Sequence, residues 1–283
     1  MKGKGHPIPQ RVMDAARLRL VVTDLDGTLI CAESDLSVAQ EAVRRTLATG
    51  RAFSIATGRI FASARSWALR LGIRHPIITD GGAVIGCPLS GKRYRHLCIP
   101  RAALGQVMCA IAGLGHQIYA FFGDEVYTNR DSEHRRRYEG ILQQPIPPDP
   151  GLVRRLVDEG RAPTRILLLV DPQEAPALRA HLQGRLPREL RVTSSMPHYV
   201  DIQHHQASKG WALRQLAELM ELTPEQVLAI GDGHYDMEML EVAGVGALVG
   251  NAPAELHPHA DMVARNCCAE GVLEILQVLG VGD

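Results

Sequence analysis

The chain has 283 residues, of which 46% are hydrophobic, and it carries 31 basic and 31 acidic side chains. This length allows one large core or two modest ones, and two are expected at ~100 to 200 residues per domain. The balanced charge offers no basic field for nucleic acid or an anionic membrane, so the composition indicates a soluble globular protein whose partner is a small molecule.

The N-terminal segment 1–17 carries a few basic groups but no continuous apolar stretch. It therefore fits neither a signal peptide nor a membrane anchor, and we expect a flexible leader. The absence of an export signal predicts a cytoplasmic location. The oligomeric state cannot be deduced from these features.

Segments 18–83 and 200–283 alternate short apolar runs with amphipathic stretches, which is typical of a doubly wound, Rossmann-like α/β core with a mainly parallel sheet. Ser37 and Thr223 are expected to cap the helical segments that follow them. The predicted strands are 18–23, 51–56, 76–79, 227–230, 246–249 and 262–264, and the predicted helices run from about 37 to 49, 61 to 71 and 209 to 220, from about 236, and at the end of the chain.

The regular alternation of predicted strands and helices is interrupted between the two halves of this core. Segment 84–199 there contains a predicted hairpin, alternating strands and a proline-rich loop at 145–150. We expect an inserted α+β cap domain there. Its aromatic residues at 119, 121 and 127 and its basic run 135–137 could face a ligand, but a core position and a solvated helix face are the expected roles.

The cysteines form no Cys-x-x-Cys pair, and two of them, Cys267 and Cys268, are adjacent. This spacing matches neither a zinc site nor a disulfide framework, so reduced thiols are expected. Histidines at 204–205 and 257–259 lack a matching ligand spacing and are expected to be ordinary loop side chains.

Polar residues gather where the predicted core strands end or a helix begins. Asp24 and Asp26 follow the first strand, one residue apart, and each could be a solvated side chain or part of a site. Thr57-Gly58 could cap a helix or bind a phosphate, Lys209 could be solvated or face an anion, and Asp232 could cap a helix or bind a cation. Each signal is weak alone.

In order and combination, Asp-x-Asp-Gly-Thr, Thr-Gly-Arg, Lys-Gly and Gly-Asp-Gly-x-x-Asp resemble the motifs of a haloacid dehalogenase superfamily phosphatase. The resemblance is to the Cof-like group with a type IIB cap, and it covers the chain from Leu18 to Leu279. It implies a magnesium-dependent phosphatase acting on a small phosphorylated metabolite, for which a sugar phosphate is one candidate.

The resemblance also implies roles for individual residues. Asp24 would be the nucleophile that forms an aspartyl-phosphate, and Asp26 the general acid and base. Mg²⁺ would bind the Asp24 carboxylate, the Asp26 backbone carbonyl and the Asp232 carboxylate. The phosphoryl group would be held by Thr57, Gly58 and Lys209, and the metal's surroundings would be oriented by Asp236 and Asn251.

Two positions depart from the family's pattern. Tyr235 stands where the family usually has Asn, directly before Asp236, so we expect a reshaped entrance and an altered substrate preference with the chemistry retained. Asp80 stands where Asn is common, a milder change. The alternatives are a phosphomutase of the phosphomannomutase type and a non-catalytic protein that binds a phosphate ester.

Overall fold

The computed structural model describes residues 16–32, 36–142, 144–159, 161–194 and 196–281. The chain divides into two compact units. The first is built from the segments Met1–Thr57, Arg65–Tyr94 and Ser208–Asp283, and the second from Gly58–Ala64 and Arg95–Ala207. The longer segment of the second unit, Arg95–Ala207, covers most of the expected insertion, 84–199, whose bounds stay a prediction. The expected leader, 1–17, lies outside the described residues except for its last two.

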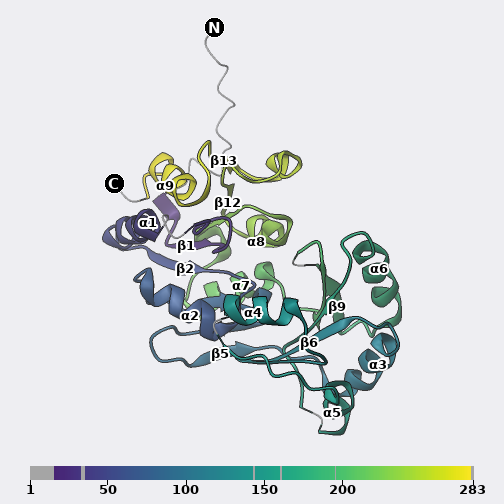
Figure 1. Ribbon diagram of the computed structural model, residues 1–283. Coiled ribbons are helices and arrows are strands. Elements are labelled where there is room, and N and C mark those ends of the chain that lie inside the picture. The colour runs from purple at the N-terminus through teal and green to yellow at the C-terminus, as the bar shows by residue number, and fades with distance from the viewer. Residues whose placement is uncertain (1–15, 33–35, 143, 160, 195, 282–283) are drawn as a thin grey trace. The chain divides into compact units, whose positions relative to one another are not determined.

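The first unit contains a five-stranded sheet in the order β13-β12-β11-β1-β2, in which every neighbouring pair is parallel (Figure 1). All four residues of β1 are buried, as expected for a strand covered by helices on both faces. This arrangement confirms the predicted doubly wound α/β fold. The strands are β1 (Leu20–Thr23), β2 (Ala52–Ile55), β11 (Val227–Gly231), β12 (Val245–Leu248) and β13 (Met262–Val263).

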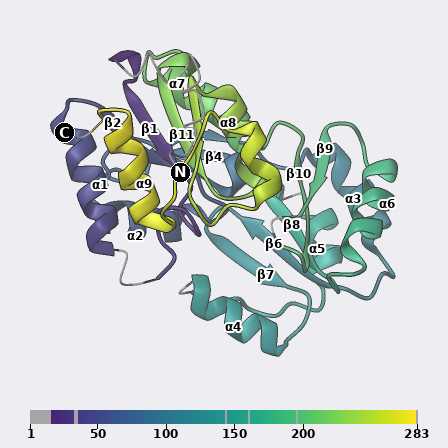
Figure 2. The same cartoon turned by 90° about the horizontal axis from the view of Figure 1, so that it is seen from above.

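Helices cover both faces of this sheet. Helices α1 and α9 lie side by side on one face, and α7 and α8 lie on the other, where Ala212 and Leu216 pack against Leu20 and Val22 (Figure 2). The helices are α1 (Leu36–Ala48), α7 (Lys209–Leu219), α8 (Met237–Val242) and α9 (Cys268–Val278), and α2 (Phe61–Arg70) spans the boundary between the units.

Of the two expected helix caps, the structure shows Thr223 but not Ser37 at an N-cap position. Helix α1 begins at Leu36, so Ser37 lies within its first turn and is not its N-cap. Thr223 is the N-cap, as expected, of a 3-10 turn, Pro224–Gln226, that leads into β11, and its N–H donates to Oε1 of Gln226 at 3.0 Å.

A small three-stranded sheet begins with the third predicted strand of the core. It consists of β3 (Ile77–Thr79), β4 (Val84–Gly86) and β5 (Arg93–His96), in that order, and β3 and β4 are antiparallel. A parallel bridge between Ala56 and Ile78 places β3 beside the end of β2. The carboxyl ends of β1, β2, β3 and β11 are therefore brought to one edge.

The second unit is an α+β module around an antiparallel sheet in the order β7-β6-β8-β10-β9. Helix α5 was not predicted from the sequence, because its seven residues are too few to show a repeated helical period; Leu152 and Leu156 are buried. The elements are β6 (Gln117–Phe122), β7 (Glu125–Thr128), β8 (Arg165–Leu169), β9 (Leu190–Thr193), β10 (Tyr199–His204), α3 (Arg101–Ile111), α4 (Glu133–Leu142), α5 (Leu152–Asp158) and α6 (Ala175–Arg185).

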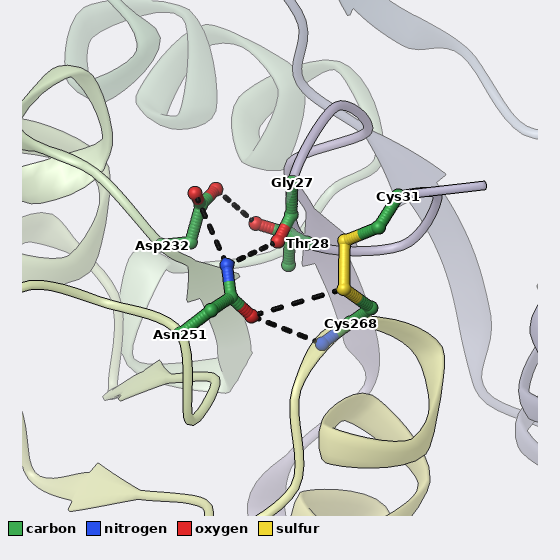
Figure 3. The surroundings of a disulfide bond; sticks show 6 residues. All are labelled: Gly27, Thr28, Cys31, Asp232, Asn251 and Cys268. Atoms are coloured by element: carbon green, nitrogen blue, oxygen red, sulfur yellow. Dashed lines mark hydrogen bonds between the residues drawn. A yellow bond between two sulfur atoms is a disulfide. The ribbon is translucent and has the colours of Figure 1, made fainter.

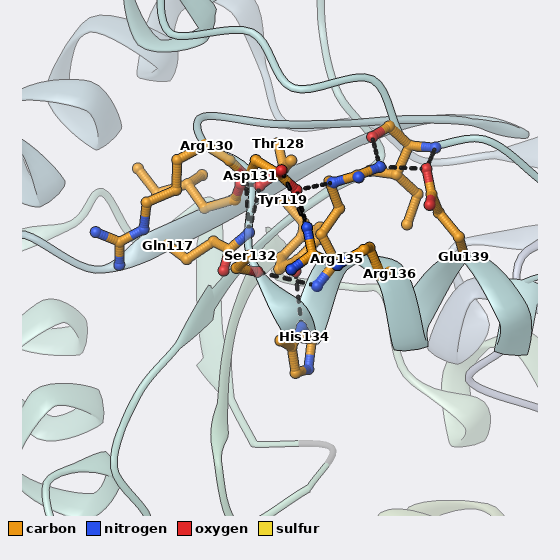
Figure 4. Close-up of polar contacts among 12 residues, drawn as sticks. Gln117, Tyr119, Thr128, Arg130, Asp131, Ser132, His134, Arg135, Arg136 and Glu139 are labelled. Carbon is orange, nitrogen blue, oxygen red and sulfur yellow. Dashed lines mark hydrogen bonds and ion pairs between the residues drawn. The ribbon is translucent and has the colours of Figure 1, made fainter.

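Within this unit, residues that the sequence analysis considered as possible ligand contacts make polar contacts with neighbouring side chains (Figure 4). Tyr119 is fully buried, and its hydroxyl lies 2.7 Å from Nδ1 of His134. On α4, Arg135 pairs with Asp131 at 2.8 Å and with Glu139 at 2.5 Å. The aromatic residue is thus part of a core, and the basic run is paired with nearby acidic side chains.

One feature corrects the sequence analysis: Cys31 and Cys268 form a disulfide. They are 237 residues apart in the chain, yet their Cα atoms lie 5.9 Å from each other. Spacing along the chain could not indicate this pair, because the fold of the parallel sheet alone brings the two segments together.

Among the helices of the described residues, none has both the length and the apolar character needed to cross a bilayer.

Candidate active site

Asp24 and Asp26 follow β1 at the carboxyl edge of the parallel sheet. The backbone N–H of Asp24 still donates to the carbonyl of Ile230 in β11, at 2.8 Å, so its position is fixed by the sheet. Asp24 is 6% exposed, whereas Asp26 is exposed to solvent. The two carboxyl groups therefore have different environments although only one residue separates them.

Lys209 is the first residue of α7, and it is buried beside two carboxylates. Its Nζ contacts Oδ1 of Asp24 and lies 2.6 Å from Oδ1 of Asp236. Burial alone lowers the pKa of Lys209, but Asp236 and Asp24 together raise it above its ordinary value. Lys209 is therefore a buried cation, and its ammonium group links the ends of β1 and β11.

Asp236 also organises the turn after β11. Its Oδ2 accepts hydrogen bonds from the backbone N–H groups of Asp232 and Gly233, both at 3.0 Å. A Cβ atom on Gly231 would lie 2.4 Å from the Cβ of Asp236, so this tight turn requires glycine. Asp236 thus braces both Lys209 and the backbone that carries Asp232, with Tyr235 half-buried beside it.

Three residues from other segments surround the Asp232 carboxylate (Figure 3). The Thr28 hydroxyl donates to Oδ1 at 2.7 Å, and Nδ2 of Asn251 lies 3.5 Å from Oδ2 and donates to the carbonyl of Gly27 at 2.8 Å. Gly27 has a φ of 90°, and a Cβ there would lie 2.6 Å from Oδ2 of Asp232. Thr28 was quoted in the sequence motif but given no role, because sequence cannot reveal a partner 204 residues away.

The electrostatics of this cluster suit a cation. Carboxylate oxygens of Asp24, Asp232 and Asp236 all lie within 4.8 Å of one another. Burial raises the pKa of Asp24 to about 8, with Lys209 opposing the rise and Asp236 and Asp232 adding to it; burial is also the main cause of the raised pKa of Asp232. Three crowded carboxylates with one ammonium group form an oxygen donor set that could hold a divalent metal ion.

The expected phosphate-binding residues lie in two places. Thr57 is fully buried after β2, its N–H donates to the Ile78 carbonyl at 3.0 Å, and its own carbonyl accepts from Gly81 at 3.1 Å. Gly58 is the first residue of a segment assigned to the second unit, so its place relative to the carboxylates stays a prediction. Its exposure is intermediate.

The turn Asp80–Gly82 closes against the start of α7. Gly82 has a φ of 102°, and a Cβ at this position would lie 2.1 Å from the carbonyl oxygen of Ser208, the residue before Lys209. Asp80, the departure noted in the sequence, adopts a left-handed φ of 54° and accepts a hydrogen bond from Thr79 at 3.0 Å. Asp tolerates this conformation, so the turn is retained.

Comparison with known proteins agrees with this arrangement. The family model for haloacid dehalogenase-like hydrolases matches residues 21–276. The chain belongs to this family. The match spans the parallel sheet, the second unit and every carboxylate of the cluster, and it confirms the phosphatase family and the Cof-like group to which the motifs pointed.

Individual members of the haloacid dehalogenase-like family resemble the chain along almost its whole length. The phosphatase YwpJ of Bacillus subtilis (strain 168) is 25% identical, over 93% of this chain and 100% of its own. The 5-amino-6-(5-phospho-D-ribitylamino)uracil phosphatase YitU of the same organism is 25% identical, over 91% and 96%. The crystal structure of TM0651 from Thermotoga maritima superposes with a TM-score of 0.75 at 25% identity, covering 93% of this chain and 97% of that one. The similarity to these named phosphatases confirms the predicted enzyme class, phosphoric monoester hydrolase.

Proposed function

We propose that the protein is a magnesium-dependent phosphatase that hydrolyses the phosphate monoester of a small metabolite through an aspartyl-phosphate on Asp24. The observation that carries this proposal is the buried contact of Asp24 with Lys209 at the carboxyl edge of the sheet, beside the Asp232 and Asp236 carboxylates. A nucleophilic carboxylate needs an anionic form and a nearby positive charge to meet an anionic ester. Lys209 supplies a positive charge, and a bound divalent cation would favour the anionic form of Asp24.

The chemistry divides into two displacements. Asp24 attacks phosphorus, and the bond to the ester oxygen breaks as Asp26 gives that oxygen a proton. Asp26 then takes a proton from a water molecule that attacks the aspartyl-phosphate, which releases inorganic phosphate and frees Asp24. The exposure of Asp26 supports this role, since its carboxyl group must exchange protons with the leaving alcohol and with water.

The remaining residues hold charge and position. Lys209, the Thr57 hydroxyl and the Gly58 N–H bind phosphoryl oxygens during transfer, a reaction that depends mostly on positioning and electrostatics. Bound Mg²⁺ would neutralise charge on the phosphoryl group. Its ligands would be the carboxylates of Asp24 and Asp232 and the backbone carbonyl of Asp26, a set that fits the crowded carboxylates of the cluster.

The substrate is expected to be small. Support comes from YitU, whose name specifies a phosphorylated ribitylaminouracil, and from the composition of the chain. The α+β unit is proposed as the cap that selects the substrate, and an assay of phosphate release from a panel of metabolite phosphates would identify the preferred class.

Hydrolysis of p-nitrophenyl phosphate with Mg²⁺ tests the proposal. The wild type should release phosphate, and Asp24→Asn should lose at least about a thousandfold in kcat because it lacks the nucleophile. Asp158→Asn, at the exposed end of α5, is the control and should keep full activity. Wild-type turnover no faster than that of Asp24→Asn would favour a phosphate-ester-binding protein. Isomerised sugar phosphate without free phosphate would favour a mutase.

A further inference from the structure

The Cys31–Cys268 disulfide joins two segments that both contribute to the surroundings of the Asp232 carboxylate. Cys31 lies four residues after Gly27, in the loop that follows β1, and Cys268 is the first residue of α9 (Figure 3). Cys31 is exposed and Cys268 is half-exposed, so a small reductant can reach the bond. The disulfide therefore links the loop of the two catalytic aspartates to the final helix.

Asn251 connects this bond to the carboxylate cluster. Its Oδ1 accepts the backbone N–H of Cys268 at 3.1 Å, while its Nδ2 donates to the Gly27 carbonyl at 2.8 Å and lies 3.5 Å from Oδ2 of Asp232. The side-chain amide is thus held at its oxygen end by the disulfide-bonded residue. At its nitrogen end it fixes the carbonyl of Gly27 and faces a proposed metal ligand.

The backbone of Cys268 shows that this position is constrained. Its φ is 53°, in the left-handed region that residues other than glycine seldom adopt. The Cys268 sulfur lies 3.9 Å from Oδ1 of Asn251, and a disulfide sulfur has no proton to donate there. After reduction, Cys268 can leave the left-handed conformation and its sulfur can compete as a donor for Asn251, so both effects favour movement of the amide.

We propose that the Cys31–Cys268 bond is a redox-controlled link that positions the Asp232 carboxylate through Asn251, so that its reduction weakens metal binding at the site. Asn251 is a positioning residue in this scheme. The inference rests on the proposed metal site and extends it to regulation.

The redox step uses a dithiol as the reductant. A thiolate of the dithiol attacks Cys31 or Cys268, the sulfur–sulfur bond breaks, and the other cysteine leaves as a thiolate that takes up a proton. The second thiol of the reductant then displaces the remaining cysteine and closes the reductant into a cyclic disulfide. Two electrons and two protons pass from the dithiol to the two cysteines.

Isothermal titration with Mg²⁺ tests the link on the full chain, oxidised or reduced with dithiothreitol and then freed of reductant under nitrogen. Reduced wild type should bind Mg²⁺ about tenfold more weakly than oxidised wild type, as expected when an outer partner of a metal ligand is lost. Cys31→Ser should match the reduced protein in either condition. Asn251→Ala should bind weakly and show no response to reduction, which a merely structural role would not predict.

Cys267→Ser is the matched control, because Cys267 is exposed, unbridged and directly beside Cys268. It should respond to reduction like the wild type. A second measurement, hydrogen exchange of the Gly27 loop without metal, should show faster exchange in the reduced protein. Equal Mg²⁺ affinity and equal exchange in both redox states would overturn the link and leave the metal site intact. No Mg²⁺ binding by any form would overturn the metal site and the link with it.

Discussion

Replacing Lys209 with methionine should destabilise the first unit strongly, and more so at high pH. The ammonium group is buried between Asp24 and Asp236, whose carboxylate oxygens lie within 4.8 Å of each other. At an effective dielectric constant of about 20, two unit charges at this distance repel by roughly 3.5 kcal/mol. Removing one partner of a buried ion pair typically costs about 3 to 5 kcal/mol, so the free energy of unfolding should fall by about 3 to 4 kcal/mol at pH 8.

The pH dependence follows from the sign of the pKa shift. Burial already raises the pKa of Asp24 to about 8 in the folded protein, above its unfolded value of 3.8, and loss of the Lys209 cation raises it further. A carboxyl group with a raised folded pKa weakens the fold progressively as pH rises from the unfolded pKa towards the folded one. At pH 5 Asp24 is protonated in the folded state of both proteins, whereas at pH 8 it is about half protonated in the wild type, so the variant's loss of stability should be smaller at pH 5, but by less than about 1 kcal/mol.

Urea unfolding in EDTA, followed by tryptophan fluorescence, measures this loss. Both tryptophans, Trp67 and Trp211, belong to the first unit and therefore report on it alone. Lys92→Met is the control, because Lys92 is exposed and its replacement should change stability by less than about 0.5 kcal/mol. A loss below about 1 kcal/mol for the Lys209 variant at pH 8, or a clearly larger loss at pH 5 than at pH 8, would refute the reasoning.

Three further substitutions probe the site and the second unit. Gly27→Ala should weaken Mg²⁺ binding at least about tenfold in calorimetry, since its Cβ would lie 2.6 Å from the Asp232 carboxylate, whereas Gly50→Ala, also at positive φ but in open space, should bind normally. Thr28→Val removes one hydrogen bond to that carboxylate and should lower the free energy of unfolding by about 1 kcal/mol in urea; no change would show the bond to be unimportant. Burial lowers the pKa of His134, so the stability of the second unit should decline as pH falls below the unfolded value of 6.5. Hydrogen exchange in β6 and β10 at pH 7.5 and pH 5.5 measures this decline, and His134→Gln should reduce it, with a remainder from His204, whose pKa is also lowered by burial.

Most of the fold was predictable from the sequence because a parallel sheet imposes simple patterns. Buried runs such as 20–23 and 227–231 read as strands, and the carboxyl ends of parallel strands meet at one edge. The sequence therefore predicts that Asp24 and Asp232 lie near each other. Lys209 was found for a related reason, since a lysine at a helix start opposes the helix dipole unless anions lie nearby.

What escaped prediction depends on contacts between distant segments. The hydrogen bond from Thr28 to Asp232 and the bond between Cys31 and Cys268 each join residues more than 200 positions apart. No local pattern encodes such a pair, because the twist and order of the sheet decide which loops touch. Helix α5 was missed for the opposite reason: it is too short to show a clear helical period.

The covalent bond between Cys31 and Cys268 turns all the chain between them into a closed ring, which includes the entire α+β unit. A protease that cuts once within this ring opens it without releasing a fragment, since the two pieces remain joined through sulfur. On a gel run without reductant the nicked protein would migrate as one band near 30.9 kDa, and with reductant as two smaller ones. Asp24, which precedes the ring, would therefore stay tethered to Asp232 and Asp236, which lie within it, after such a cut.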